Sequence, residues 1–419
     1  MSGPAAGQKS AKLFYGWRIV AAIFVILTFS SGLGFYNHTV IMQALSTERS
    51  FPITVTSNAV SVFFITTGVS GLLIARLIEW FDIRITIICG GLLAGLSLAL
   101  IGQVTSHFEL YAVYVLFGIG FSAAGLLPGT TLVTRWFRKR RALALSIAST
   151  GLSLGGVIIT PLSAHLISSL GIARASLWLG ITFILGTIPV CILFIRSFPA
   201  EIGLGMDGEP LDEFDSVAQQ DGLSFRSALG NRFFWGTALS YVFVMLAQVG
   251  GIAHQFGLLG EQLTVQQAAM GLAVLPMFSI MGRLLGGMIV DRISIRAFTA
   301  GMMFAQCLAL LIMALSSAPW VLLFGLAFFG ITVGNLLMLQ PLLIAEAFGL
   351  HHYPRIYSMS NLLTTVGVAA GPALMGWIYT LEATYSWSYV AASAAGMVSL
   401  VIFVYAGPVT QHHVRFNSG

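Results

Sequence analysis

The sequence predicts an all-α membrane protein with twelve transmembrane helices arranged as two pseudo-symmetric six-helix bundles. Composition is the first observation: 8% of the 419 residues are charged, 57% are hydrophobic and the mean hydropathy is +0.90. In soluble domains about a quarter of residues are charged. The second observation is a series of apolar runs long enough to cross about 30 Å of hydrocarbon. The third is a single polar stretch that divides these runs into two equal sets.

The apolar runs, each bounded by charged or turn residues, define the predicted helices. The first set covers residues 17–42, 54–78, 85–104, 109–133, 142–169 and 176–195. The second set covers residues 233–256, 267–290, 297–316, 319–347, 357–380 and 387–407. We therefore expect an N-terminal bundle over residues 1–197 and a C-terminal bundle over residues 232–419.

The polar stretch 198–231 separates the two predicted bundles. It is rich in acidic residues and has no apolar periodicity, so we interpret it as a solvated cytoplasmic linker.

Basic residues are distributed unequally between the two sets of loops. Those on the side of the N-terminus are Arg84, Arg135, Arg138, Lys139, Arg140, Arg141, Arg196, Arg226, Arg232, Arg292, Arg296 and Arg355, against Arg49 and Arg174 on the other side. This asymmetry follows the positive-inside rule and predicts a multi-pass cell-membrane protein, in a bacterium the inner membrane, with both termini cytoplasmic. It also accounts for the basic surplus without a nucleic-acid partner.

One charge lies inside a predicted span. Arg283 precedes the charged pair Asp291 and Arg292 by about two turns, which places it at membrane depth. Intramembrane charges are costly and usually face a cavity, a partner or a transport pathway. The alternative is that the side chain extends along the helix to the cytoplasmic surface.

Several polar residues interrupt the other apolar spans, and we take them as candidate substrate contacts. They are Asn37, Tyr241, His254, Asn335 and Asn361. His254 and His38 are also candidates for proton coupling, because a histidine has an unperturbed pKa near physiological pH. Each of these polar residues has the alternative role of a hydrogen bond between neighbouring helices.

The two halves repeat a short motif, and no motif for other chemistry occurs. Leu116-Phe117-Gly118 recurs as Leu323-Phe324-Gly325, which indicates a duplicated unit with a substrate site near the midplane. The chain has no P-loop signature, nucleophile elbow or histidine-cysteine metal spacing. We therefore expect neither an enzyme nor a cofactor.

Gly287 followed by Asp291 and Arg292 resembles the loop signature of the major facilitator superfamily, and the first half carries a degraded copy with Ala75 and Glu79. Within that superfamily, Tyr15-Gly16-Trp17 and the run 136–144 resemble signatures of monocarboxylate porters, and other segments are similar to oxalate/formate antiporters. The resemblance implies the major facilitator fold. It implies conformational or gating roles for Gly287, Asp291, Arg292 and Arg140.

By the same similarity Arg283 matches the arginine that binds substrate carboxylate. Thr364 stands where oxalate antiporters have a second intramembrane lysine, and a single cation favours a monoanion over a dianion. Ser279 stands where proton-coupled animal members have an aspartate. The resemblance implies a secondary active transporter that moves a small monocarboxylate or other organic monoanion by alternating access, with proton symport. The alternatives are an organic-anion exchanger of the oxalate/formate type and a drug efflux carrier.

Overall fold

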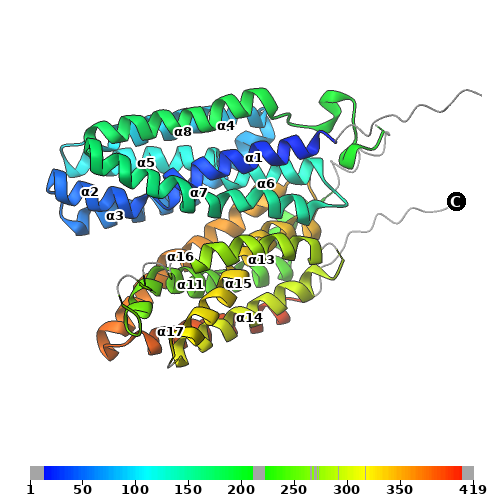
Figure 1. Cartoon of the computed structure of the whole chain (residues 1–419). Coiled ribbons are helices and arrows are strands. Elements are labelled where there is room, and N and C mark those ends of the chain that lie inside the picture. The colour runs from blue at the N-terminus through cyan, green and yellow to red at the C-terminus, as the bar shows by residue number, and fades with distance from the viewer. Residues whose placement is uncertain are drawn as a thin grey trace, which may run out of the picture.

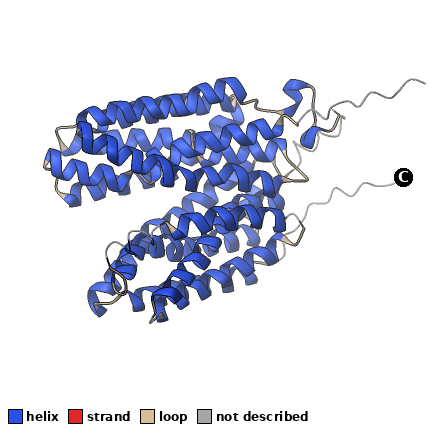
Figure 2. Cartoon of the chain, viewed as in Figure 1, coloured by secondary structure: helices blue, strands red, loops and turns tan. Residues whose placement is uncertain are grey.

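The computed structural model describes residues 14–210, 222–264, 267–268, 271, 273–290, 292–316 and 318–407. These residues form helices joined by short loops, and two isolated β-bridges are the only strand-like pairings in the described part (Figure 2). Among the described residues, 11 helices are long and apolar enough to cross a membrane, and Val274–Val290 is a shorter apolar helix. This architecture agrees with the predicted fold class.

The first half contains the helices before the linker. They are α1 (Gly16–Ser30), the π-helix η1 (Ser31–Phe35), α2 (His38–Arg49), α3 (Ile53–Trp80), α4 (Ile83–Ile101), α5 (His107–Ala123), α6 (Leu126–Trp136), α7 (Arg141–Leu170) and α8 (Ile172–Phe194). The sequence predicted one helix over 17–42, but the structure interrupts it at η1. There Ser31 Oγ donates a hydrogen bond to the Leu152 carbonyl at 2.7 Å, which ties the widened turn to α7.

The second half follows two short helices of the linker. The elements are η2 (Pro199–Ile202), η3 (Met206–Gly208), α10 (Phe225–Leu229), α11 (Arg232–Gly260), α13 (Val274–Val290), α14 (Ile295–Leu315), α15 (Pro319–Phe348), α16 (Tyr353–Glu382) and α17 (Tyr385–Tyr405). The predicted eighth span began at residue 267. The helix α13 begins at Val274, and several residues before it lie outside the described part.

The predicted linker makes specific contacts with both halves. Asp207 Oδ2 accepts hydrogen bonds from the backbone amides of Arg138 and Lys139, at 3.1 and 2.8 Å. The Leu223 amide donates to the Phe348 carbonyl at 2.9 Å. The described parts of the linker are therefore attached to the loop before α7 and to the end of α15.

The two halves form separate layers of helices that meet along α7 with α13 and along α3 with α16 (Figure 1). Within each half, glycines allow two helices to approach closely. A Cβ atom on Gly155 of α7 would lie 2.3 Å from the Thr28 carbonyl of α1, and one on Gly367 of α16 would lie 1.9 Å from the Val242 carbonyl of α11. Such small-residue contacts are a common basis of helix packing in membranes.

Asp82 fixes the start of α4 outside the membrane-spanning segments. Its carboxylate accepts a hydrogen bond from the Arg84 amide at 2.8 Å, pairs with the Arg84 guanidinium and accepts from Ser197 Oγ at 2.6 Å. Burial alone would raise the pKa of Asp82, but these hydrogen bonds outweigh it and lower the pKa to about 2. The ionised carboxylate is therefore a helix cap that stabilises the fold.

We expect Asp82→Ala to lower the free energy of unfolding by about 1 kcal/mol at neutral pH, the usual contribution of a helix cap. Since the folded-state pKa is depressed, this contribution is complete above the ordinary pKa of about 4 and is lost as the pH falls through about 2. Thermal unfolding of both proteins in detergent between pH 7 and pH 2 measures it. A difference that does not shrink over this acid range would contradict the assignment.

Candidate functional site

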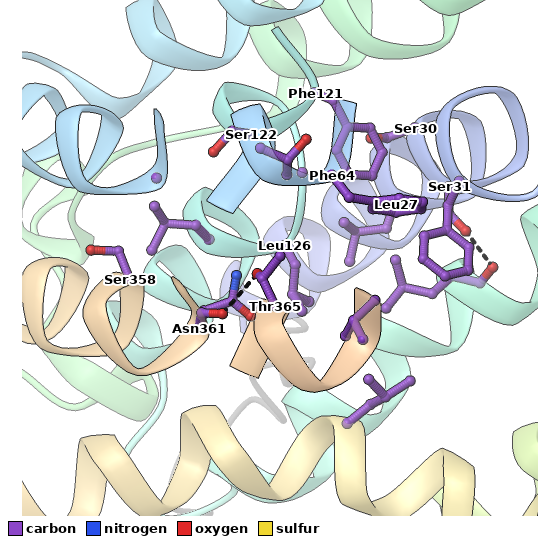
Figure 3. A pocket seen from close by; sticks show the side chains of 18 of the residues that line it. Leu27, Ser30, Ser31, Phe64, Phe121, Ser122, Leu126, Ser358, Asn361 and Thr365 are labelled. Carbon is purple, nitrogen blue, oxygen red and sulfur yellow. Dashed lines mark hydrogen bonds between the residues drawn. The ribbon is translucent and has the colours of Figure 1, made fainter. Parts of the chain in front are cut away.

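A cavity of about 210 Å³ lies between the two halves (Figure 3). The first half lines it with Leu27, Ser30, Ser31, Phe35, Tyr36, Phe64, Thr67, Gly71, Phe121, Ser122, Gly125, Leu126, Leu127 and Leu152. The second half lines it with Leu337, Tyr357, Ser358, Asn361, Thr365 and Val368. The cavity is therefore located where alternating-access transporters of two parallel repeats place their substrates.

The lining combines aromatic rings with hydroxyl and amide groups. Phe64 and Phe121 lie on the first-half side, and Ser358, Asn361 and Thr365 come from α16 (Figure 3). Among the residues that line this cavity there is no Asp, Glu, Lys, Arg or His. A polar ligand can thus form hydrogen bonds here, but any full charge must be neutralised from outside the immediate wall.

Arg283 is fully buried in α13 and lies at the contact between the halves. Its Nε donates a hydrogen bond to the Gly334 carbonyl of α15 at 2.9 Å, and its Nη1 donates to the Ser149 carbonyl of α7. Its Nη2 has no hydrogen-bond partner in the part of the chain that the structure describes. The guanidinium thus points into the protein and does not extend to the surface.

Arg283 has no acidic partner among the described residues. Among the described residues it is the only Asp, Glu, Lys or Arg that is buried as a whole residue, and no ion pair within the described part includes it. A buried charge is expensive unless it is neutralised. The arrangement therefore favours an anion as the missing partner.

Three residues of the cavity wall locate Arg283 relative to the cavity. Leu152 follows Ser149 by about one turn of α7, and Leu337 follows Gly334 by about one turn of α15. Tyr36 also lines the cavity and interacts electrostatically with Arg283. The guanidinium thus lies next to the wall where the two halves meet.

Asn335 and Ser279 add polar atoms beside Arg283. Asn335 Nδ2 donates to the carbonyls of Gly282 and Ile331, both at 2.9 Å, while its Oδ1 has no partner. Ser279 Oγ also lacks one. Asn335 therefore braces α13 against α15 on the turn that carries Arg283, outside the cavity lining.

The other predicted polar residues of the second half have different surroundings. Asn361 lines the cavity. Tyr241 is buried, and its hydroxyl donates to the Leu336 carbonyl at 3.1 Å. His254 Nε2 lies 2.9 Å from the Pro372 carbonyl. In this conformation Tyr241 and His254 connect helices, and neither lines the cavity.

Asn37 and His38 are buried at the break between η1 and α2 and do not line the cavity. Neither side chain has a hydrogen-bond partner for its nitrogen or oxygen atoms among the residues that the structure describes. The His38 ring lies among aromatic rings, with centroids 4.4 Å from Phe63 and 5.8 Å from Tyr114. The Asn37 and His38 side chains therefore lie in an apolar environment with their polar atoms unsatisfied.

Gly287 lies at the contact between the halves. A Cβ atom on Gly287 would lie 2.0 Å from Ser146 Oγ of α7, so α13 and α7 meet closely there. Arg140 and Arg292 are exposed, and Asp291 lies outside the described residues. Of the four predicted gating residues, Gly287 is thus the one seen at the interface.

A salt bridge that sequence reasoning missed also joins the halves. Glu79 at the end of α3 lies 2.5 Å from Arg355 Nε at the start of α16 and 3.5 Å from His352 Nδ1. The sequence signal was Glu79 itself, in the degraded copy of the loop signature. The linker residue Leu223 bonds to Phe348 just before α16 begins, so this pair lies at the end of the molecule that carries the linker helices, which we call the linker end.

Two helical halves around a central cavity are the architecture of a membrane transporter. The chain belongs to the Major Facilitator Superfamily, whose profile matches residues 24–336 and 249–419. This confirms the family resemblance and the fold class inferred from the sequence.

Similar proteins include organic-anion transporters. The oxalate:formate antiporter of Oxalobacter formigenes is 23% identical over 418 residues, which cover 95% of each chain. Monocarboxylate transporter 12-B of Danio rerio is 25% identical over 347 residues, covering 72% of this chain and 68% of the relative. Among solved structures, the fucose:proton symporter of E. coli has a TM-score of 0.72 at 15% identity and covers 94% of this chain and 100% of its own.

Proposed function

We propose that this protein is a secondary active transporter that moves a small monocarboxylate or other organic monoanion across the cytoplasmic membrane by alternating access and proton symport. The observation that carries the proposal is the buried Arg283 guanidinium, which has no acidic partner in the described part of the chain and lies beside the central cavity. The similarity of the chain to an oxalate:formate antiporter and to monocarboxylate transporters supports the same substrate class.

A carboxylate would supply the negative charge that the buried Arg283 guanidinium needs as a partner. A guanidinium offers two parallel N–H donors to the two oxygens of a carboxylate, and such charge-assisted pairs are stronger than neutral hydrogen bonds. Arg283 is a single cation, so one negative charge neutralises the site and two would leave an excess. This arithmetic favours a monoanion over a dianion.

The position of Arg283 provides a way to couple substrate binding to movement. Its Nη1 bonds to the Ser149 carbonyl of the first half, while Nε bonds to Gly334 of the second half. A carboxylate that takes up the Nη1 and Nη2 donors would compete with the Ser149 carbonyl. Substrate binding would then weaken one contact between the halves and favour their rearrangement.

For the proton we keep His38 and His254 as candidates. His38 has both ring nitrogens without a hydrogen-bond partner among the described residues, whereas His254 Nε2 is engaged with the Pro372 carbonyl.

We place the linker end on the cytoplasmic side, as the positive-inside distribution predicts.

Uptake of labelled monocarboxylates into proteoliposomes, with and without an inward proton gradient, tests the proposal. We expect accumulation driven by the gradient and none of the matching neutral amides. Uptake that needs unlabelled anion on the far side and ignores the gradient would replace symport by exchange. Transport of neutral hydrophobic compounds but of no anion would support drug efflux instead and overturn the proposal.

A further inference from the structure

We infer that the cargo is a monoanion with an apolar body about the size of an aromatic ring, held with its charged group toward Arg283. The inference rests on the proposed function and adds the class of substrate. Its basis is the size of the cavity and the kinds of side chain that line it.

The cavity volume suits a cargo of intermediate size. A volume of about 210 Å³ is below the range of roughly 300–1,000 Å³ that is typical for drug-sized ligands. It is also many times the roughly 10–15 Å³ of cavity volume that one water molecule needs. A one- or two-carbon acid would leave most of this space to water, whereas a ring-sized body fills it.

The lining favours an apolar body. Phe64 of α3 and Phe121 of α5 face the cavity together with leucines of α6 and α15, as Figure 3 shows for Phe64, Phe121 and Leu126. Aromatic side chains provide large contact areas and prefer edge-to-face or offset packing with another ring. A flat apolar cargo would thus gain contacts that formate or oxalate cannot make.

The lining also limits the charge of the cargo. Apart from Arg283 beside the wall, there is no charged or histidine side chain at this cavity in the described part of the chain. A second carboxylate or an ammonium group would therefore be desolvated without a partner. Ser358 and Asn361 on α16 can instead form hydrogen bonds with a neutral hydroxyl substituent.

Competition for uptake and thermal stabilisation of the purified protein test the inference. The probes are benzoate, 4-hydroxyphenylacetate, acetate, formate, oxalate, phenylalanine and benzyl alcohol. We expect the two aromatic monoanions to be transported with a KM at least about tenfold lower than that of acetate, a usual discrimination for an apolar pocket. Oxalate, phenylalanine and benzyl alcohol should neither compete nor stabilise.

Two variants change the cavity volume in opposite directions. Phe121→Ala removes a wall ring and should raise the KM for benzoate about tenfold while leaving that for acetate nearly unchanged. Gly71→Leu should exclude benzoate but still admit acetate, because a Cβ atom on Gly71 would meet no atom closer than 3.7 Å and the side chain can extend into the cavity. Phe304→Ala is the matched control, since Phe304 is 53% exposed on the outer face of α14.

The outcomes separate this inference from the proposed function. Efficient uptake of formate or acetate with no preference for aromatic acids would overturn the inference and leave the monocarboxylate transporter intact. Equal recognition of benzyl alcohol and benzoate would overturn the proposed anion site, even if Phe121→Ala and Gly71→Leu still showed a ring-sized cavity. Equal effects of Phe121→Ala and Phe304→Ala would also overturn the inference.

Discussion

Arg283→Gln should reduce carboxylate uptake by about 100-fold and leave the protein folded. The substitution removes the buried positive charge and the two-pronged donor geometry, and a charge-assisted hydrogen-bond pair contributes about 1.5–3 kcal/mol. A difference of about 1.4 kcal/mol corresponds to a factor of ten. Stability should be retained because a glutamine amide still donates to a carbonyl, while the cost of burying an unpaired charge disappears.

Initial uptake rates in proteoliposomes and thermal unfolding in detergent measure the two effects separately. Arg283→Lys keeps the charge but loses the planar fork, so we expect an intermediate loss of about tenfold. Arg174→Gln is the control, because it removes a positive charge that is exposed at the start of α8. Uptake by a folded Arg283→Gln protein at the wild-type rate would refute the role of Arg283 as the anion site.

The sequence predicted most helices because a membrane imposes a length and a composition that can be counted along the chain. It did not predict the break at Ser31–Phe35, because a serine and two glycines are tolerated within an apolar membrane span. The break depends on a tertiary contact: a Cβ atom on Gly32 would lie 2.7 Å from the Gly155 carbonyl of α7. Such an approach cannot be deduced from the composition of one segment.

Site residues could be predicted from the sequence where their depth in the membrane is enough to identify them as functional. Arg283 is unusual at any orientation in a membrane helix, and the structure buries it between the halves. Asn361, Tyr241 and His254 all have the required depth, but only Asn361 lines the cavity. Periodicity in a uniformly apolar helix does not show which face is turned toward the other half.

The aromatic wall was missed for a related reason. Phe64 and Phe121 are ordinary residues for a lipid-facing helix, and a phenylalanine at a cavity has the same sequence signal as one in lipid. Tyr36, beside Arg283, follows a π-helix that the sequence did not predict. The charged functional residue can therefore be identified from this sequence, whereas the residues that give the cavity its shape can be identified only from the fold.

Glu79→Gln should open the linker end, because Glu79 and Arg355 form a salt bridge between α3 and α16. The side chains are 14% and 25% exposed, between the buried and surface cases. Loss of one partner should therefore cost about 1–2 kcal/mol, between surface pairs and fully buried ones. The carboxylate also lies at the N-terminus of α16, where the helix dipole adds to the attraction.

This cost shifts the population of the conformation with a closed linker end by about tenfold. The shift is measurable with the variant Ser358→Cys in a protein that also carries Cys89→Ala. An impermeant thiol reagent added at the linker end should label this cysteine faster when Glu79→Gln is present. Glu79→Arg should label faster still, because it places two positive charges together.

The charge swap Glu79→Arg with Arg355→Glu decides whether the pair itself closes this end. It restores opposite charges across the same two helices, so labelling should return toward the wild-type rate. Glu209→Gln is the control, because Glu209 pairs with Lys139 on the exposed surface and that salt bridge is outside the contact between α3 and α16. A swap that labels as fast as Glu79→Arg would mean that each residue acts alone. Closure at the linker end would then depend on close helix packing such as that between Gly287 and Ser146.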